Sequence, residues 1–217
     1  MQADSTDFFL PGQGLEVLEE RNVLHLFLGQ KSVQDLIYHR PPLDVIPATL
    51  TLSKLQKLTN DTNYYTYRLR EGIAEIQDRY DFILIDTPGS SRFELQAALS
   101  LADLVIIPVT PSKWAIRAIN LLLDEISATE TLFSQKKQTA FLPVLFGSSK
   151  KHRDLLDRLK LIEEIHTLPE IPKSESIKTK TEKHEFLKKD TQAFMAFETL
   201  AEGVMSLIEP PLSYPLG

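Results

Sequence analysis

The chain has 217 residues, 42% of them hydrophobic and 25% charged, a composition typical of a globular α/β protein. Its 24 Lys and Arg residues against 30 Asp and Glu residues give a formal net charge of −6, which excludes a uniformly basic nucleic-acid-coating protein but permits a local basic patch. The absence of cysteine excludes disulfides and thiolate chemistry, and the polar N-terminus and short apolar runs indicate neither export nor a membrane span, so we expect a cytoplasmic protein.

The first part of the chain predicts short helices and one short strand. Residues 22–29 end on a glycine as a short helix does, and residues 32–38 can form another helical turn or two. Residues 43–47 alternate in polarity and stop at a proline, which predicts a short strand. In residues 64–79 apolar side chains recur at spacings of three and four, which predicts an amphipathic helix that leads directly into Asp81.

A rhythm of alternating strands and helices follows. The apolar run Phe-Ile-Leu-Ile at residues 82–85 is too short for a helix and is closed by Asp-Thr-Pro-Gly, which predicts a buried parallel strand with its loop. Residues 92–101 predict a helix, and the apolar residues 104–109 predict a second buried strand. We therefore expect a three-layer α/β/α fold, in which helices cover both faces of a mostly parallel sheet.

The rest of the chain continues this alternation. We expect helices at residues 113–128, 150–164 and 191–208, and strands at residues 139–146 and 165–171. The last of these strands is expected at an edge, because Pro169 interrupts it. The sequence contains no internal repeat, low-complexity tract or linker, so we expect a single domain over residues 1–217. Ligands in such folds bind at the carboxyl ends of strands, which points to the loops at residues 86–91, 110–113 and 147–150 and after Ile171.

Asp86 is the candidate with the clearest chemistry. An acidic residue directly after a buried apolar strand lies at the wet edge of the sheet, where its carboxylate can hold Mg²⁺ through the water shell of the ion. The same carboxylate could instead cap the following loop or helix. The five histidines lack ligand spacing and no G-x-S-x-G motif is present, so neither an imidazole metal site nor a hydrolase nucleophile is expected.

The run YDFILIDTP at residues 80–88, followed by ADLVIIPV at residues 102–109, resembles the ParA/Soj- and MinD-type partition ATPases, a branch of the P-loop fold. Residues 23–29 and 43–48 are similar to a short helix and an LDLIPA-like strand of that family. Residues 171–173, Ile-Pro-Lys, resemble the Ile-Pro-Arg turn that lies near the nucleotide base in the family. Together these motifs cover the chain from about residue 4 to residue 208.

The resemblance implies a function and assigns roles to single residues. It implies ATP or ADP and Mg²⁺ as cofactors, a nucleotide-sandwich homodimer, non-specific DNA binding, and ATP hydrolysis when a ParB-like partner engages the protein. Asp86 would be the catalytic-site carboxylate that holds Mg²⁺ through water, and Thr87 and Pro88 would shape the edge beside the γ-phosphate. Pro172 and Lys173 would lie near the base.

The chain departs from the family at its N-terminal end. The phosphate loop K-G-G-x-G-K-[ST] is absent from the sequence, and residues 12–14, Gly-Gln-Gly, form only a plain turn motif. Residues 2–6, with Asp4, fall at the family's D-x-D-P-Q-like switch segment, so one strand, the phosphate loop and one helix have no counterpart. The missing strand would leave the edges of neighbouring strands open. Either the chain is a shortened form of a longer protein, or it is a non-hydrolysing relative that repairs the gap through a partner.

Two basic stretches, at residues 150–160 and 173–189, are candidates for DNA contact. Interleaved acidic residues make a solvated face the alternative reading, above all in the second stretch. Trp114 is either a contact residue or an aromatic packed under a loop. Two further functions stay open: a non-hydrolysing pseudo-ATPase binding module, and a MinD-like regulator of cell division or positioning. Residues 191–208 have almost no basic residues on their polar side, which indicates core packing rather than membrane binding.

Overall fold

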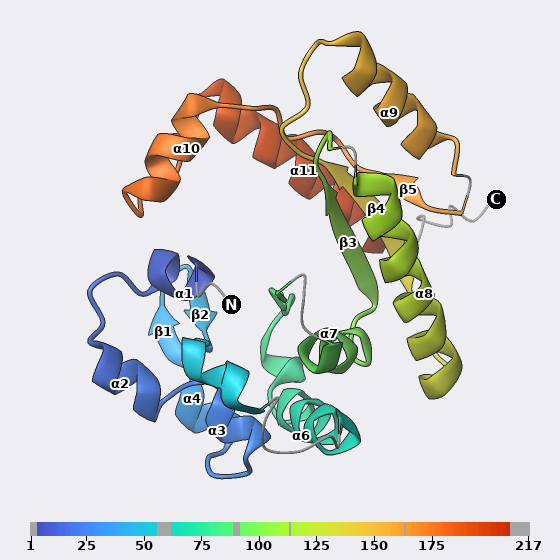
Figure 1. The fold of residues 1–217 in the computed structure, drawn as a ribbon. Coiled ribbons are helices and arrows are strands. Elements are labelled where there is room, and N and C mark those ends of the chain that lie inside the picture. Colours follow the sequence, from blue (N-terminus) through green and yellow to red (C-terminus); the bar gives the residue numbers. More distant parts are fainter. Residues whose placement is uncertain (1–3, 56–61, 89–91, 113, 163, 209–217) are drawn as a thin grey trace, which may run out of the picture. The chain divides into compact units, whose positions relative to one another are not determined.

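A computed structural model describes residues 4–55, 62–88, 92–112, 114–162 and 164–208 (Figure 1). The chain divides into two compact units, Met1–Leu101 and Ala102–Gly217. Among the helices of the described ranges, none combines the length and the apolar character that crossing a membrane requires.

The first unit consists of short helices and one β-hairpin. Its elements in chain order are α1 (Asp4–Phe9), α2 (Leu15–Glu20), α3 (Val23–Phe27), α4 (Val33–Leu36), β1 (Tyr38–Arg40), β2 (Leu43–Val45), the 3₁₀ helix η1 (Leu50–Lys54), α6 (Thr62–Ala74), the 3₁₀ helix η2 (Gln77–Arg79) and α7 (Arg92–Leu99). The helices predicted over residues 22–29, 32–38, 64–79 and 92–101 are confirmed, as is the short strand within residues 43–47. That strand pairs with β1 in an antiparallel hairpin.

Local side-chain caps explain where two of these helices begin. The side chain of Asn22 accepts a hydrogen bond from the backbone N–H of Leu24 at the start of α3. Ser32 accepts one from the backbone N–H of Asp35 at the start of α4. Such caps satisfy N–H groups that have no partner inside the helix.

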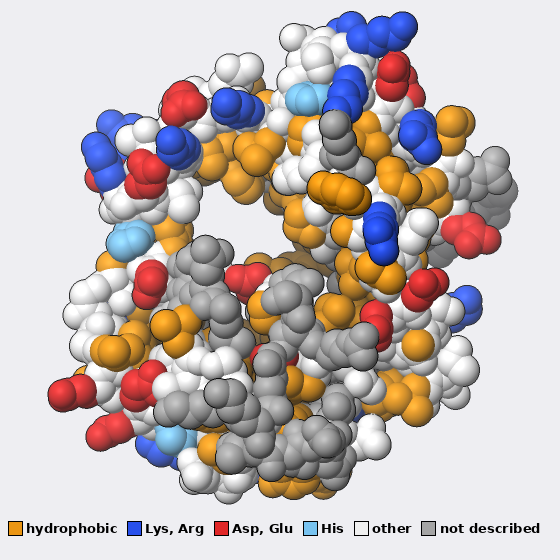
Figure 2. Space-filling model, in the orientation of Figure 1, with side chains coloured by type: hydrophobic (Ala, Val, Ile, Leu, Met, Phe, Trp, Pro, Cys, Tyr) orange, Lys and Arg blue, Asp and Glu red, His pale blue; other side chains and the backbone are white. Residues whose placement is uncertain are grey.

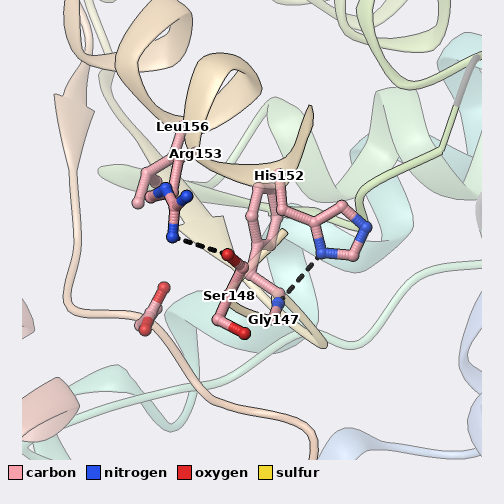
Figure 3. A pocket seen from close by; sticks show the side chains of 7 residues that line it. Gly147, Ser148, His152, Arg153 and Leu156 are labelled. Atoms are coloured by element: carbon pink, nitrogen blue, oxygen red, sulfur yellow. Dashed lines mark hydrogen bonds between the residues drawn. The ribbon is translucent and has the colours of Figure 1, made fainter. Parts of the chain in front are cut away.

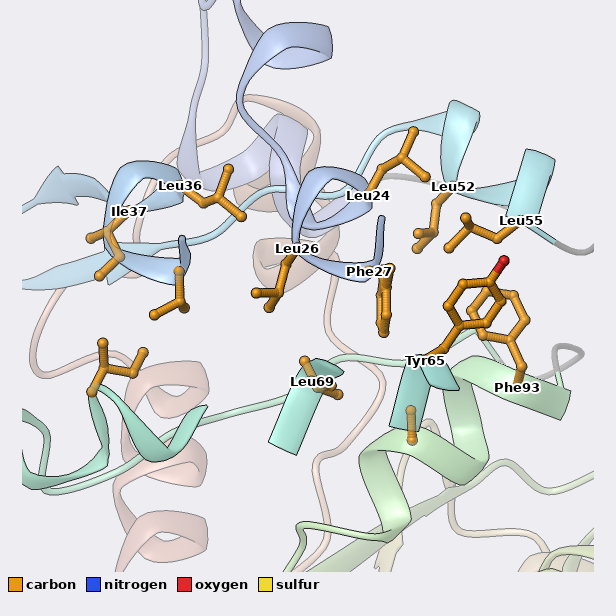
Figure 4. Close-up of a cluster of buried hydrophobic side chains, with 13 residues drawn as sticks. Leu24, Leu26, Phe27, Leu36, Ile37, Leu52, Leu55, Tyr65, Leu69 and Phe93 are labelled. Atoms are coloured by element: carbon orange, nitrogen blue, oxygen red, sulfur yellow. The ribbon is translucent and has the colours of Figure 1, made fainter. Parts of the chain in front are cut away.

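The apolar faces of α3, α4, α6 and α7 form one buried core (Figure 4). The rings of Phe27, Tyr65 and Phe93 contact one another, with centroids 5.9 Å apart for Phe27 and Tyr65, 5.3 Å for Tyr65 and Phe93 and 6.0 Å for Phe27 and Phe93. Helix α6 passes close to α3 at Gly72, where the lack of a side chain leaves room for Leu26. A Cβ atom at Gly72 would lie only 2.8 Å from the Leu26 side chain. Burying a large apolar side chain contributes about 1.5–3 kcal/mol, so this cluster is the main source of stability in the first unit.

The prediction of a buried strand at residues 82–85 is wrong. Residues 82–88 have no regular secondary structure, and the four apolar side chains are exposed, with Leu84 91% exposed. A parallel strand is buried only when other strands pair with its edges and helices cover its faces. Within the described part of the first unit, the only sheet is the β1–β2 hairpin, and it leaves this segment unpaired.

The second unit contains the parallel sheet. Its elements are β3 (Leu104–Val109), α8 (Ala115–Phe133), β4 (Gln138–Pro143), α9 (Lys150–Lys160), β5 (His166–Thr167), α10 (Glu175–Glu182) and α11 (Gln192–Ile208). The strand order is β3-β4-β5, all parallel, and β3 and β4 pair from Leu104↔Gln138 to Val109↔Pro143. The strands and helices predicted after residue 102 are confirmed, whereas α10 was not predicted. The fold is therefore α/β with a parallel sheet, and Figure 1 shows α11 passing behind that sheet.

The position of β3 differs from the expectation of a fully buried strand. In the described residues β3 pairs only with β4, and only Ile107 and Val109 are buried along it, while Pro108 is exposed. An all-apolar strand is typical of the interior of a parallel sheet, and here it forms the edge.

Candidate functional site

Asp86 is tied to the first helix of the chain. Its Oδ2 atom accepts a hydrogen bond from the Ser5 hydroxyl at 2.5 Å. The next residue, Thr6, fixes α1 in place, since its hydroxyl donates to the Ala48 carbonyl at 2.9 Å and accepts from the Ala48 N–H at 3.0 Å. Helix α1 is thus anchored to the loop after β2 while it presents Ser5 to Asp86.

The structure brings part of the predicted site together. Of the predicted switch segment at residues 2–6, Ser5 contacts Asp86, while residues 2 and 3 and the side chain of Asp4 lie outside the described residues. Thr87 and Pro88 follow Asp86 and are partly buried, and the rest of the predicted loop, residues 89–91, also lies outside the described residues. The roles predicted for Asp4, Asp86, Thr87 and Pro88 stay predictions.

The donor chemistry at Asp86 suits a hard cation. The carboxylate is exposed, and its Oδ2 atom accepts a hydrogen bond from the Ser5 hydroxyl of α1. A carboxylate has about four lone-pair positions, so a single hydrogen bond leaves capacity for the water shell of Mg²⁺. Carboxylate and hydroxyl oxygens are the ligand types that Mg²⁺ prefers.

A second polar contact fixes the start of the segment that leads to Asp86. The Tyr80 hydroxyl donates to Asp44 Oδ2 at 2.6 Å, and the Asp44 Oδ1 atom lies 2.9 Å from His39 Nδ1. The Tyr80 hydrogen bond, with help from His39, holds the pKa of Asp44 below its ordinary value, and the Asp44 carboxylate raises the pKa of Tyr80. This network could not be predicted from the sequence, because nothing local links Asp44 and Tyr80, which are 36 positions apart.

The second unit carries a pocket of about 340 Å³ at the loop after β4 (Figure 3). Its lining residues are Phe146, Gly147, Ser148, His152, Arg153, Leu156 and Glu170. The loop at residues 147–150 is one of those predicted to bind a ligand from its place at the carboxyl end of a strand. Sequence reasoning did not single out His152 or Glu170.

Hydrogen bonds define the wall of this pocket. The Gly147 N–H donates to His152 Nδ1 at 3.0 Å, so the imidazole proton of the neutral ring is on Nε2. The Arg153 guanidinium donates to the Ser148 carbonyl at 2.6 Å, and Ser149 caps α9. The wall therefore combines a cationic group, an imidazole N–H and an apolar ring.

Pro172 and Lys173 lie at the same carboxyl edge as the pocket. They follow Ile171, whose N–H donates to the Pro143 carbonyl at 2.9 Å and whose carbonyl accepts from the Leu145 N–H at 3.0 Å. Pro172 is partly buried and Lys173 is exposed. The predicted nucleotide role of these two residues stays a prediction.

The two basic stretches differ in whether their lysines and arginines form ion pairs with acidic residues. Lysine and arginine side chains gather over α9 at the top of Figure 2, and those exposed on this helix are Lys150, Lys151, Arg153, Arg158 and Lys160. In the second stretch Lys178 pairs with Glu182, and Lys180 pairs with Glu185. The α9 face is therefore the stronger candidate for a polyanion. Trp114 is 71% exposed, which favours a contact residue over an aromatic packed under a loop.

Comparisons with known proteins identify sequence relatives of this chain. Residues 1–139 match the family described as "AAA domain". An uncharacterized protein of Methanocaldococcus jannaschii is 29% identical over 211 residues, covering 90% of this chain and 81% of that protein. A ParA family protein of Chlamydia pneumoniae is 33% identical over 113 residues, which cover 48% of this chain and 44% of that protein.

A solved structure shows the same fold. A putative plasmid partition protein of Borrelia burgdorferi, bound to AMPPNP, superposes with a TM-score of 0.81 at 22% identity, covering 95% of this chain and 83% of that one. The family match extends over more than half of the chain, and the sequence relatives include ParA proteins. This chain belongs to the ParA/Soj-type partition ATPase family.

Proposed function

We propose that this protein acts in the segregation of a chromosome or plasmid, through ATP-dependent dimerisation, non-specific DNA binding and a ParB-like partner. The observation that carries the proposal is the carboxylate of Asp86, which begins the Asp-Thr-Pro segment that resembles the family's and accepts a hydrogen bond from Ser5 of α1. A carboxylate at that place can hold the Mg²⁺ of a bound nucleotide.

The residues of the chain fit part of the nucleotide. Asp86 would hold Mg²⁺ through water, Thr87 and Pro88 would line the edge beside the terminal phosphate, and Pro172 and Lys173 would lie near the base. When bound, ATP·Mg²⁺ would supply the charged group that links two copies of the protein. The numbered sequence has no glycine-rich loop to surround the phosphates, so no hydrolytic step is assigned to its residues.

The exposed basic residues of α9 would contact DNA through its phosphates. Binding of this kind does not depend on sequence and weakens steeply as salt displaces the contacts. We expect weak binding of an unrelated fluorescent duplex, measured by anisotropy, to fall steadily as salt rises from about 50 to about 200 mM. Binding that does not change with salt would contradict a phosphate-contact mechanism.

Substitutions locate the DNA surface. Changing Lys150, Lys151, Arg158 and Lys160 to Gln should lower affinity for every sequence alike and reduce the salt slope by about one for each lost contact. The control is a variant with Lys178→Gln and Lys180→Gln, which removes lysines that already pair with glutamates in α10 and the loop after it. If only the control variant lost affinity, the assignment to α9 would be wrong.

A second candidate function is a pseudo-ATPase binding module that does not hydrolyse ATP. We expect millimolar ATP·Mg²⁺ to change the Tm of this chain little, and a rise of several degrees would count against the module. The MinD-like alternative is less favoured, because α11 contains Glu198 and Glu202 but no Lys or Arg with which to bind a membrane surface.

A further inference from the structure

Helix α8 exposes large apolar side chains that its packing in the second unit does not use. Figure 1 shows α8 in front of the parallel sheet, and the residues that it buries are Ala115, Ile119, Ile126 and Thr129. Trp114, Leu121 and Leu132 belong to a different side of the helix and are 71%, 62% and 60% exposed. Burial in the core therefore does not explain why these three positions are apolar.

The three residues belong to one row along the helix. From Trp114 the row continues, in steps of four and three residues, to Ala118, Leu121, Glu125, Ala128 and Leu132, and each of these side chains is exposed. Such steps average about 3.5 residues, close to the turn of a helix of about 3.6 residues, so the row lies along one side of α8. Single exposed apolar residues are ordinary, but a row with this period is typical of the seam along which two helices pack.

The charges beside the row indicate what packs there. Arg117 lies in the N-terminal half of α8, whereas Asp124 and Glu125 lie in its C-terminal half, and all three side chains are exposed. Two copies of α8 side by side in parallel would set each charged residue against its own counterpart, and like charges repel. In an antiparallel pair, Glu125 lies opposite Leu121 of the second copy, one helical turn from Arg117 of that copy. The charge pattern of α8 therefore complements itself in the antiparallel direction.

We propose that α8 binds a second copy of this chain along this row, in an antiparallel pair of helices that forms without nucleotide. Trp114 packs against Leu132 of the second copy, and Arg117 pairs with its Glu125. The interface is isologous, since the same residues contribute from both copies. This inference goes beyond the proposed function, whose dimer is linked by ATP, and it does not depend on that function.

Sedimentation velocity without nucleotide tests the pairing. We expect the wild type to pass from monomer to dimer as its concentration rises through the micromolar range. Leu121→Glu should weaken this association at least about tenfold, because it sets a second carboxylate against Glu125. The matched control is Leu161→Glu, the same change at a leucine that is 78% exposed at the end of α9 and outside the row, and it should associate like the wild type.

Three outcomes would overturn the inference. These are a wild type that stays monomeric at every concentration, an equal loss of association in Leu121→Glu and Leu161→Glu, and association that needs ATP and persists in Leu121→Glu. The last outcome would leave the nucleotide-linked dimer of the proposed function standing. Circular dichroism should show the same helix content in both variants and the wild type, since both leucines are exposed.

The fluorescence of Trp114 locates the interface. It is the single tryptophan of the chain, so its emission reports on this end of the row alone. We expect the emission to move to shorter wavelength as the concentration rises, with the same midpoint as dimerisation, because the ring passes from water into the interface. Dimerisation without that shift would place the interface elsewhere and contradict the inference.

Charge reversal tests the direction of the two helices. Arg117→Glu and Glu125→Arg should each weaken dimerisation, because each puts like charges together across an antiparallel pair. The double variant, Arg117→Glu with Glu125→Arg, should restore it, since opposite charges face each other again. A double variant that associates no better than either single variant would show that these residues do not pair between copies.

Discussion

The Ser5 hydroxyl donates a hydrogen bond to Asp86 Oδ2 at 2.5 Å and so joins the start of α1 to a residue 81 positions later in the chain. Asp86 lies on a segment without regular secondary structure, so this contact, rather than a strand, fixes where its carboxylate lies. Because Thr6 ties the same helix to Ala48, the position of Ser5 is itself held by the fold. The carboxylate is therefore placed before any cation binds.

Removing the Ser5 hydroxyl should weaken the first unit slightly. We expect Ser5→Ala to lower the free energy of unfolding by about 0.5–1 kcal/mol, because the hydrogen bond is exposed to solvent. Urea denaturation followed by circular dichroism measures the change. The control is Ser53→Ala, whose hydroxyl donates only to the Leu50 carbonyl within η1. A Ser5→Ala midpoint equal to that of the wild type would show that the contact does not hold Asp86.

The hydrogen bond between Tyr80 and Asp44 should be visible in the titration of Asp44. A carboxylate with a lowered pKa stabilises the fold above its ordinary pKa of 3.8, and this stabilisation is lost as the pH falls through the lowered value. Tyr80→Phe removes the main cause of the lowering, so the pKa of Asp44 should rise toward its ordinary value. Carbon-detected NMR of the Asp44 carboxyl measures it.

A matched control exists for that experiment. Tyr67→Phe removes a tyrosine hydroxyl whose hydrogen bond goes to Glu71 at 3.3 Å rather than to Asp44, so it should leave the Asp44 titration unchanged. The Tyr80 hydroxyl provides the opposite check, since the raised pKa of Tyr80 favours the folded state below its ordinary value of 10.0 and that benefit disappears at higher pH. Identical Asp44 titrations in the wild type and Tyr80→Phe would refute this network.

Glu94 should make the protein less stable as the pH rises. It lies in the first turn of α7, is 6% exposed, and both carboxylate oxygens lack a hydrogen-bond partner in the described structure. Burial raises the pKa of Glu94, so the folded state holds its proton more tightly than the unfolded chain. Stability then falls as the pH rises from the ordinary pKa of 4.5 through the raised value.

Two substitutions at Glu94 test this pH dependence. Glu94→Leu should raise the Tm at neutral pH, because an unsatisfied buried polar group costs about 1–3 kcal/mol and each kcal/mol corresponds to about 2–4 °C in a chain of this size. Glu94→Gln should match the wild type below pH 4.5 and exceed it at neutral pH. Thermal denaturation at several pH values checks both. A difference between the wild type and Glu94→Gln that does not vary with pH would contradict the account.

Local patterns predicted most of the fold. Helices α6, α8 and α11 carry apolar residues at helical spacing, and β3 and β4 are compact apolar runs, so neighbours along the chain determine them. Helix α10 was missed because its residues are mostly charged or hydroxyl-bearing; its one local signal is the Ser174 side chain, which accepts from the Ile177 N–H. Residues 82–85 look like a strand, yet burial depends on partner strands that no local pattern can supply.

In the candidate site, too, local motifs identified some residues, whereas contacts between distant residues could not be predicted. Asp86, Pro172 and Lys173 were identified from motifs. Ser5 was included only as a member of the switch segment at residues 2–6, and its contact with Asp86 was not predicted, because a contact between residues 81 positions apart leaves no mark in local spacing.

The central claim, that Asp86 holds the metal ion of a nucleotide, is tested most directly by paramagnetic NMR with Mn²⁺·ATP in place of Mg²⁺·ATP. The account predicts that millimolar Mn²⁺·ATP broadens the signals of Ser5, Asp86 and Thr87, that Asp86→Asn abolishes this broadening, and that Asp81→Asn at the start of the same segment does not. Broadening that persists in Asp86→Asn, or that appears only at other residues, would contradict it.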